Sequence, residues 1–480
     1  MTIDSTLSVA RTVAQVVARR LAEATGEFAV IGLGRSGVAA ARLLRRAGLR
    51  VYASDRSSGE AVQQDAERLR AEGVDVDVGT HDLARIARAV VVVASPGVPP
   101  SAAPLQAARD AGVPVVGEVE IALRLQPALR YIAVTGTNGK TTTTALIGHL
   151  LRALGLDAAD VGNIGTPVSA LALQDRPPAW AALEMSSFQL HDTPGLFPDV
   201  GVLTTLSPDH LDRYTDVDEY YADKARLFLN AVPQSRWVVT ADNDAVRVMM
   251  QGVAGACYRF STQHTTGVDA WYDRGTGMLH ALGAPFMPRD RVTLTGDHNV
   301  ANVLAAVLAV MVADAAHTTP QARARLADAV STFRAPPHRL EPVVDRNGLL
   351  WLDDSKATNV ASTLVALAGM TRPTIVLLGG RHKGEPYTAL VPELQRVAKA
   401  VLAYGEATEH IVGDLRDVLA STVPVEAMPS ASFADVMARA RALAVPGDVV
   451  LLSPACSSYD MFTNYEERGR EFARLAESLT

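Results

Sequence analysis

The sequence predicts an α/β protein with three domains. Short apolar runs alternate with helical patterns along nearly the whole chain, which is typical of parallel strands joined by crossover helices. The chain has 480 residues, which is too long for one ordinary hydrophobic core. Two glycine-rich loops, each between a predicted strand and a predicted helix, indicate nucleotide sites in the first two domains.

The predicted domains meet near residues 124 and 335. Residues 1–124 form the first domain, with an additional helix within 1–26; residues 125–335 form the central domain, and residues 336–480 form the third. Pro336 and Pro337 predict a stiff linker between the last two domains.

Each domain has its own set of predicted strands. They cover 28–34, 50–55 and 89–97 in the first domain, 130–136, 181–185 and 200–206 in the second, and 373–380, 400–405 and 448–456 in the third. The central domain also has a predicted helix over 141–154 and a long buried helix from Asn302. We therefore expect Rossmann-like N-terminal and C-terminal domains and a central, mostly parallel sheet of the P-loop ATPase type.

Composition and charge argue against several classes of protein. A net charge of −7 argues against nucleic acid as the main partner. Cys257 and Cys456 have no metal-ligand spacing, and a disulfide framework is not expected. The longest apolar run, Val303–Ala313, is too short to cross a bilayer, and the N-terminus lacks the pattern of a signal peptide. We expect a cytoplasmic protein without membrane insertion.

The first glycine-rich loop follows the first predicted strand. Gly32, Gly34 and Gly37 have the spacing G-x-G-x-x-G, and Asp55 ends the next strand. Backbone amides in such a loop can face a diphosphate, while the acid can bind a ribose hydroxyl. Alone, the motif fits a nicotinamide or flavin enzyme, any other nucleotide diphosphate, or a tight packing turn.

The second glycine-rich loop, AVTGTNGKTTTTA, covers residues 133–145. Gly136, Gly139, Lys140 and Thr141 fit a phosphate-binding motif, although Val134 stands where the usual spacing has a further glycine. The lysine can neutralise phosphate charge, and the threonine hydroxyl can bind Mg²⁺. A strand before the loop and a helix after it are the context that the motif requires.

Several candidate metal ligands follow the later strands of the central domain. Glu184 ends an apolar strand, where a buried carboxylate is costly without a cation. The next strand leads to Asp209, His210 and Asp212, of which the histidine is either a metal ligand or a structural residue. Lys224 lies on a predicted helix, where most lysines point into solvent.

Seven segments, in order, resemble the Mur ligases of bacterial cell-wall synthesis. They are TGTNGKT (135–141), LEMSSFQL (183–190), SPDHLDRY (207–214), GDHNVANVLAA (296–306), PHRLE (337–341), DDSKATN (353–359) and LLSPACSSYDMF (451–462). The resemblance extends over nearly the whole chain after residue 26.

The resemblance implies an ATP-dependent ligase of peptidoglycan precursor synthesis, acting as a monomer on small molecules. In such an enzyme ATP phosphorylates a substrate carboxylate, and the amine of an amino acid attacks the acyl phosphate. Within the family, DDSKATN favours the members that add D-glutamate to UDP-N-acetylmuramoyl-L-alanine. ATP and two Mg²⁺ ions are the implied cofactors.

The resemblance also assigns residues to sites. The implied catalytic residues are Lys140, Glu184, His210 and Lys224, and the implied metal ligands are Thr141, Glu184, His210 and Lys224, the last matching a lysine that the family carbamylates. The implied ATP contacts are Gly136, Thr137, Asn138, Gly139, Lys140, Thr141, Thr142, Asn299, Asn302, Arg339 and Asp354, with His338 beside them.

The remaining assigned residues concern the two substrates. Gly34, Arg35, Ser36, Asp55, Arg56, Asn163, Ser186 and Gln189 would bind the UDP-linked substrate, and Lys356, Thr358, Lys383, Ser458 and Tyr465 would bind D-glutamate. Tyr465 departs from the family, which often has phenylalanine there. Arg381 and His382 add bulky side chains just before Lys383.

Two other functions fit part of the sequence. A nicotinamide-dependent oxidoreductase would use the first glycine loop but leaves Lys140, Glu184 and DDSKATN without a role. A non-enzymatic, ATP-driven switch would use the second loop and would hydrolyse ATP without a second substrate.

Overall fold

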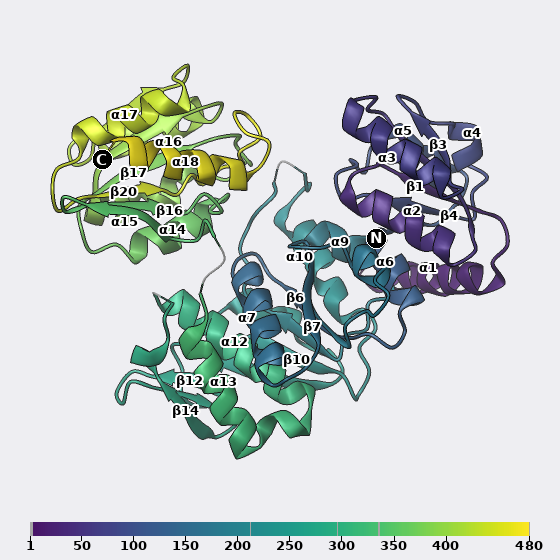
Figure 1. Ribbon diagram of the computed structural model, residues 1–480. Helices are drawn as coiled ribbons and strands as arrows, with labels where there is room; N and C mark the ends of the chain where they lie inside the picture. The colour runs from purple at the N-terminus through teal and green to yellow at the C-terminus, as the bar shows by residue number, and fades with distance from the viewer. Residues whose placement is uncertain (1–2, 212, 295, 335–336, 480) are drawn as a thin grey trace. The chain divides into compact units, whose positions relative to one another are not determined.

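Two compact units make up the chain in the computed structural model, which describes residues 3–211, 213–294, 296–334 and 337–479, and only the backbone of 3–9. One unit contains Met1–Leu206, Tyr221–Thr293 and Val300–Phe333, and the other contains Ser207–Tyr220, Leu294–Asn299 and Arg334–Thr480. The first unit holds two sheets and the second holds one (Figure 1). The described residues do not include Asp212, Ala335 or Pro336. The predicted domain boundary between residues 335 and 336 therefore also lies outside the described residues.

The N-terminal sheet is parallel, in the order β3-β2-β1-β4-β5. Its strands are β1 (Glu27–Ile31), β2 (Arg50–Asp55), β3 (Asp75–Val78), β4 (Val91–Ala94) and β5 (Val115–Gly117), and its helices are α2 (Arg35–Arg46), α3 (Glu60–Ala71), α4 (Leu83–Ile86), α5 (Ala103–Asp110) and α6 (Glu118–Leu125). All four residues of β4 are buried, as expected for a strand with helices on both faces of its sheet.

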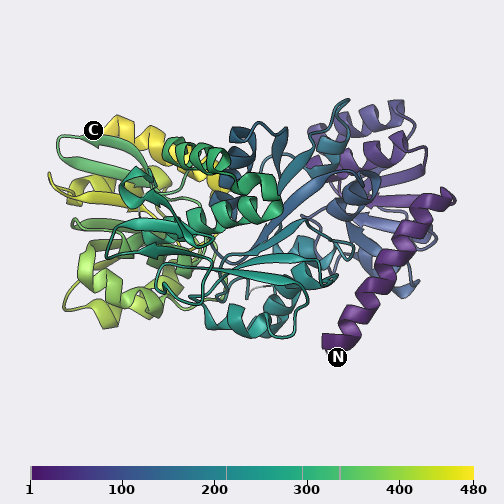
Figure 2. The same ribbon diagram turned by 90° about the horizontal axis from the view of Figure 1, so that it is seen from below.

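The additional N-terminal helix is confirmed as α1 (Ile3–Glu23). Ala10, Ala14 and Val17 are buried along one face of it. The Arg11 guanidinium donates to the Leu229 carbonyl at 2.6 Å. These contacts hold α1 along one side of the first unit, as Figure 2 shows.

The central sheet has nine strands in the order β14-β13-β12-β11-β10-β9-β6-β8-β7. They are β6 (Arg130–Thr135), β7 (Ala158–Gly162), β8 (Trp180–Glu184), β9 (Val200–Leu203), β10 (Arg236–Thr240), β11 (Ala256–Ser261), β12 (Ala270–Asp273), β13 (Met278–Ala281) and β14 (Ala284–Pro288). The pairs from β7 to β12 are parallel, which confirms the mostly parallel sheet. The antiparallel strands β12 to β14 were not predicted.

Seven α-helices in the described residues accompany the central sheet: α7 (Lys140–Ala153), α8 (Val168–Ala172), α9 (Ser187–His191), α10 (Val217–Ala225), α11 (Asp244–Met249), α12 (Asp297–Ala313) and α13 (Pro320–Thr332). The long buried helix predicted from Asn302 is α12, and the predicted start is wrong because the helix begins at Asp297. The apolar run marks only its buried part, whereas its first turn is polar.

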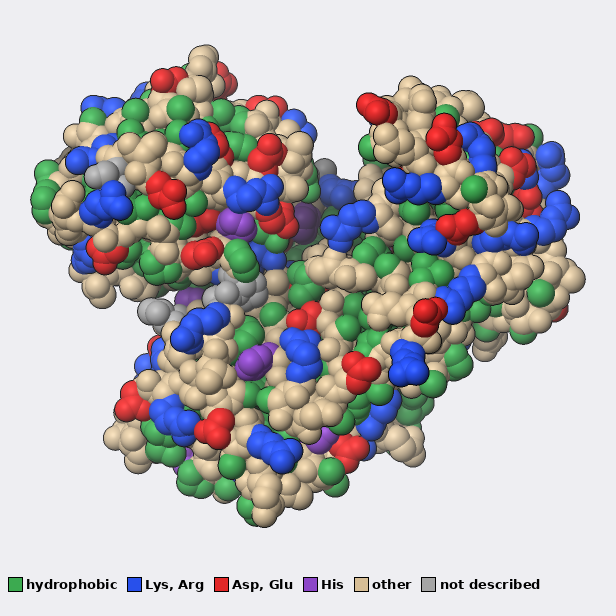
Figure 3. Space-filling model, in the orientation of Figure 1, with side chains coloured by type: hydrophobic (Ala, Val, Ile, Leu, Met, Phe, Trp, Pro, Cys, Tyr) green, Lys and Arg blue, Asp and Glu red, His purple; other side chains and the backbone are tan. Residues whose placement is uncertain are grey.

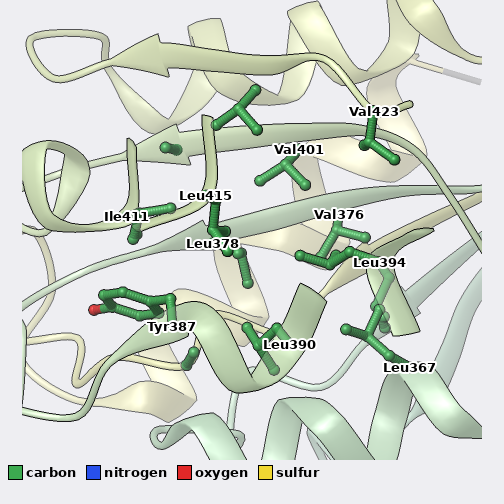
Figure 4. Close-up of a cluster of buried hydrophobic side chains, with 14 of the residues drawn as sticks. Leu367, Val376, Leu378, Tyr387, Leu390, Leu394, Val401, Ile411, Leu415 and Val423 are labelled. Atoms are coloured by element: carbon green, nitrogen blue, oxygen red, sulfur yellow. The ribbon is translucent and has the colours of Figure 1, made fainter. Parts of the chain in front are cut away.

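The C-terminal sheet has the order β15-β16-β20-β17-β18-β19. Its elements are β15 (Glu341–Arg346), β16 (Leu349–Asp353), β17 (Thr374–Gly379), β18 (Ala398–Tyr404), β19 (Val425–Met428), β20 (Val449–Leu452), α14 (Val360–Ala368), α15 (Val391–Val397), α16 (Thr408–Leu419), α17 (Phe433–Leu443) and α18 (Tyr465–Leu479). Strands β16, β20, β17, β18 and β19 are parallel to their neighbours in this order, and β15 pairs antiparallel with β16. Figure 4 shows part of the core between this sheet and its helices, including Val376, Leu394 and Leu415.

The visible surface mixes charges of both signs (Figure 3). Within the described part of the chain, no helix combines the length and the apolar character needed to cross a bilayer.

Candidate functional site

The second glycine loop joins the end of β6 to the start of α7, as predicted. Lys140 is the first residue of α7, and its ammonium group donates to the carbonyls of Gly136 and Thr137, both at 2.8 Å. The backbone N–H of Thr137 donates to Thr205 at 2.7 Å, which ties the loop to the segment after β9. The loop therefore wraps around its own lysine at the N-terminus of a helix, where the helix dipole favours anions.

Glycine is required at two positions of this loop because of backbone angle and space. Gly136 has φ +145° and Gly139 has φ +82°. A Cβ on Gly136 would lie 2.0 Å from Thr204 Oγ1, and one on Gly139 would lie 2.4 Å from Asn302 Oδ1. The predicted nucleotide contact Asn302 thus lies directly against the loop.

Glu184 ends β8, the strand next to β6, and its side chain is 1% exposed. Its Oε1 accepts a hydrogen bond from Asn163 Nδ2 at 2.8 Å, whereas its buried Oε2 has no partner among the described residues. A buried carboxylate oxygen without a donor is costly unless a cation binds it. Glu184 therefore fits a divalent metal ion beside the phosphate loop.

Lys224 is buried, with 1% of its surface exposed, and does not occupy the solvated position typical of a helical lysine. It lies on α10, and its Nζ donates to the Gly136 carbonyl at 2.8 Å. Lys140 donates to the same carbonyl. The structure thus brings Lys140, Lys224 and the phosphate loop together.

The residue before Lys224 fixes α10 against α9. The Asp223 carboxylate bonds to His191 Nδ1 at 2.8 Å and accepts from Arg226 Nε at 3.1 Å. The bond to Asp223 raises the pKa of His191 above its ordinary value, against the opposing effect of burial. This pair was not identified from the sequence, because two charged residues far apart in the chain give no local signal.

Ser186 and Gln189 form a capping box at the start of α9. Ser186 Oγ accepts the Gln189 N–H at 3.2 Å, and Gln189 Oε1 accepts the Ser186 N–H at 3.0 Å. These side chains have a structural role in addition to any contact with a substrate.

Three of the residues assigned to the UDP-linked substrate, Gly34, Arg35 and Ser36, lie in the first glycine loop and at the start of α2, and Asp55 and Arg56 lie at the end of β2. Asp55 Oδ2 accepts the Leu33 N–H at 2.6 Å, and its Oδ1 accepts the Ser57 N–H at 2.7 Å. Gly37 is packed so tightly that a Cβ would lie 1.8 Å from the Gly32 carbonyl. Gly34, Arg35 and Arg56 are exposed, Ser36 and Asp55 are half-buried, and Arg35 donates to the Gly165 carbonyl.

In the second unit, Asp209 and Lys383 form a buried ion pair at 3.3 Å. Asn359 Nδ2 also donates to Asp209, at 2.8 Å. His210 has φ +57°, and its Nε2 lies 3.7 Å from Asp209 Oδ2. Sequence reasoning missed Asn359, although it is the last letter of DDSKATN.

Two of the assigned nucleotide contacts of the second unit, Arg339 and Asp354, lie next to β15 and β16. Asp354 accepts from Ser453 Oγ at 2.8 Å, and burial raises its pKa to about 7. Arg339 precedes β15, and its Nε is buried without a partner among the described residues. Asn299 lies in the first turn of α12 and is half-buried.

The residues assigned to D-glutamate lie in three loops of the second unit and at the start of α18. Lys356 Nζ lies 4.9 Å from the centre of the Tyr465 ring, which is a cation–π arrangement. Ser458 is buried, and Thr358 is half-buried. Lys383, already described, follows a loop in which Arg381 turns outward to pair with Glu406 at 2.9 Å.

Two glycines, Gly379 and Gly380, precede the bulky residues Arg381 and His382. Gly379 and Gly380 have φ of +158° and +131°. The fully buried Arg468 fixes the neighbouring segment by donating to the Ser355 carbonyl at 2.8 Å and to Ser355 Oγ at 2.9 Å. Arg468 was missed because nothing in its local sequence marks an arginine as buried.

Comparison with known proteins gives consistent matches along the chain. Three family models match: the Mur ligase MurD-like N-terminal domain over residues 26–117, the Mur ligase middle domain over 134–310, and the Mur ligase glutamate ligase domain over 338–456.

Relatives match over nearly their whole length. A protein of Acidobacterium capsulatum is 39% identical over 93% of this chain and 95% of its own, and one of Anaeromyxobacter dehalogenans is 42% identical over 93% and 96%. Both are named UDP-N-acetylmuramoylalanine–D-glutamate ligase.

Solved structures share the fold at low sequence identity. MurC from Thermotoga maritima has a TM-score of 0.59 and 18% identity over 95% of this chain and 100% of its own. MurF from Thermotoga maritima, solved in complex with ADP, has a TM-score of 0.60 and 16% identity over 90% and 96%. The predicted three-domain α/β fold is confirmed.

Proposed function

Because the chain belongs to the Mur ligase family, we propose that it joins D-glutamate to UDP-N-acetylmuramoyl-L-alanine, with conversion of ATP to ADP and phosphate. The relatives named for this reaction match over more than nine-tenths of the chain. One arrangement supports the chemistry. Lys140 and Lys224 both donate to the Gly136 carbonyl. The neighbouring strand β8 ends at Glu184, whose buried Oε2 has no partner among the described residues.

The reaction begins with a poor electrophile, a carboxylate. Its oxygen attacks the γ-phosphorus of ATP, which forms an acyl phosphate and releases ADP. The D-glutamate amine then attacks the acyl carbon, loses a proton, and displaces phosphate from the tetrahedral intermediate. The phosphate loop from Gly136 to Thr142 would hold the ATP phosphates, and Lys140 would neutralise their charge.

Magnesium would neutralise phosphate charge, and the residues present fit it. Glu184 offers a buried oxygen that no described residue donates to, and Thr141 lies in the first turn of α7. We assign His210 and Lys224 to a second ion.

Lys224 as a carbamate would be an anion and a metal ligand. Its burial favours the neutral amine that carbamylation needs.

The other assignments complete the proposal. The ATP contacts are Gly136, Thr137, Asn138, Gly139, Lys140, Thr141, Thr142, Asn299, Asn302, Arg339 and Asp354; the UDP-substrate contacts are Gly34, Arg35, Ser36, Asp55, Arg56, Asn163, Ser186 and Gln189; the D-glutamate contacts are Lys356, Thr358, Lys383, Ser458 and Tyr465. We place the domains at 1–124, 125–335 and 336–480, and propose a monomer of the cytoplasm.

Phosphate release from ATP tests the type of activity. A ligase should release phosphate only when UDP-N-acetylmuramoyl-L-alanine and D-glutamate are both present, and should form an amide in equal amount. Release without the second substrate would instead indicate an ATP-driven switch. Fluorescence transfer from the protein to bound NADH would favour the oxidoreductase.

A further inference from the structure

His338 lies in a strained backbone conformation that several groups hold in place. Its φ is +64°, in the left-handed region, which is unfavourable for a residue other than glycine. Its backbone N–H donates to Glu341 Oε2 at 2.8 Å, and its carbonyl accepts the Lys356 N–H at 3.2 Å. The segment before β15 is thereby fixed to the segment after β16.

The side chain of His338 is paired with a buried acid. Its Nδ1 lies 2.6 Å from Oδ2 of Asp353, whose side chain is 1% exposed. The other carboxylate oxygen accepts the Ser355 N–H at 2.8 Å. Both oxygens of Asp353 are therefore engaged, and the imidazole has one preferred orientation.

Helix α18 leaves space for this pair through a glycine. A Cβ on Gly469 would lie 2.1 Å from His338 Nδ1 and 2.6 Å from Asp353 Oδ2. Any larger residue at 469 would therefore displace the imidazole or the helix.

The first residue of α18 connects this pair to the amino-acid site. The Tyr465 ring meets the His338 ring edge-on, with centroids 6.2 Å apart and an interplanar angle of 82°. On the Tyr465 ring lies the Lys356 ammonium group, 4.9 Å from the ring centre. Ser355 Oγ donates to the Tyr465 carbonyl at 2.8 Å, which fixes the same turn.

We propose that Asp353, His338 and Gly469 form a positioning unit that orients the Tyr465 ring, and through it the Lys356 ammonium group, for the carboxylates of the incoming amino acid. This inference rests on the proposed function of the Lys356 site. The three residues act through Tyr465 and are positioning residues.

Kinetics of variants separate positioning from general destabilisation. Asp353→Asn keeps the shape but loses the charge, and Gly469→Ala displaces the imidazole, so each should raise the KM for D-glutamate about fivefold to tenfold, with the KM for UDP-N-acetylmuramoyl-L-alanine unchanged. Tyr465→Leu removes the ring and should raise the KM for D-glutamate as much as Asp353→Asn does. Asp448→Asn, which removes a buried carboxylate paired with Lys399 in the same unit, is the matched control and should leave this KM unchanged.

The pH dependence gives a second readout. The bond to Asp353 raises the pKa of His338, with Glu341 and Glu466 acting in the same direction and burial acting against them. The wild-type imidazole therefore keeps its proton to higher pH than the imidazole of Asp353→Asn. NMR titration of His338 should show a lower midpoint in the variant, and its KM for D-glutamate should begin to rise at lower pH.

Two different failures are distinguishable. If the wild type is active and the D-glutamate KM is unchanged in Asp353→Asn or in Tyr465→Leu, the positioning unit alone is overturned. A wild type that never requires D-glutamate overturns the proposed function, and the inference with it. If Gly469→Ala does not fold, the isosteric Asp353→Asn still decides between these results.

Discussion

At the level of single residues, the central site contains polar groups whose burial requires a ligand. Almost none of the Glu184 surface is exposed; one of its carboxylate oxygens is hydrogen-bonded, and the other has no partner in the part of the chain that the structure describes. Lys224 is equally buried, and its Nζ donates to the Gly136 carbonyl that Lys140 also contacts. Such burial is costly for stability alone, so these residues are where we expect the chemistry.

Replacing Lys224 tests its role directly. Lys224→Ala should lower kcat by about 10²–10³, because it removes a charged group beside the phosphate loop. Lys224→Met retains most of the side-chain volume and should lower kcat by as much as Lys224→Ala. Equal losses would show that the effect comes from the missing charge and not from packing. Steady-state phosphate release measures both variants.

The same variants test the carbamate. A short carboxylic acid should partly restore Lys224→Ala, where the side chain leaves space, and should not restore Lys224→Met. Nearly normal activity in either variant would contradict a catalytic role.

How far single residues could be predicted depended on their local sequence. Gly136, Gly139 and Lys140 lie in a motif that itself requires their geometry, and they lie together in the structure. Asp353 lies in DDSKATN, but neither its pairing with His338 nor the packing of Gly469 gave a local signal, because both are contacts between distant segments.

At the level of elements, the phosphate loop depends on what lies beside it. β6 lies between β8 and β9, so the loop after it meets the ends of both neighbours. Thr204 follows β9 and donates to the Asn138 carbonyl at 2.5 Å, and α12 places Asn302 against Gly139. The loop is thus shaped by two segments far from it in sequence.

Two glycines at opposite ends of α7 allow the cost of a positive backbone angle to be measured separately from the cost of a steric contact. Gly139 has φ +82° and almost no space, whereas Gly155 has φ +85° and open space around it. Gly155→Ala should therefore lower the free energy of unfolding by about 1–2 kcal/mol, from the backbone angle alone. Gly139→Ala should lower it further and should also raise the KM for ATP. Urea unfolding and steady-state kinetics measure the two effects, and equal behaviour of the variants would contradict the contact with Asn302.

Elements were predictable where apolar patterns were long and buried. The strands around both glycine loops and the helix α1 match their predictions within a few residues. The start of α12 was wrong because its first turn is polar, and the antiparallel strands β12 to β14 were missed because their residues are only partly buried. Periodicity reports burial, so it weakens wherever a strand or helix reaches the surface.

At the level of the whole molecule, the order of the motifs carried more information than any one of them. Each glycine loop alone fitted several nucleotide-binding functions. Three family models then match in the same order along the chain, and the relatives cover more than nine-tenths of it. Lys356, Lys383 and Tyr465, to which we assign the choice of amino acid, all lie in the second unit.

The most direct test of the proposed function supplies the protein with ATP, Mg²⁺ and UDP-N-acetylmuramoyl-L-alanine together with D-glutamate, L-glutamate, L-alanine or a diamino acid, one at a time. Phosphate release and the mass of the product are measured in each reaction. We expect amide formation with D-glutamate, and little with the other three. A preference for any of the other amino acids would contradict the proposed function while leaving the fold unaffected.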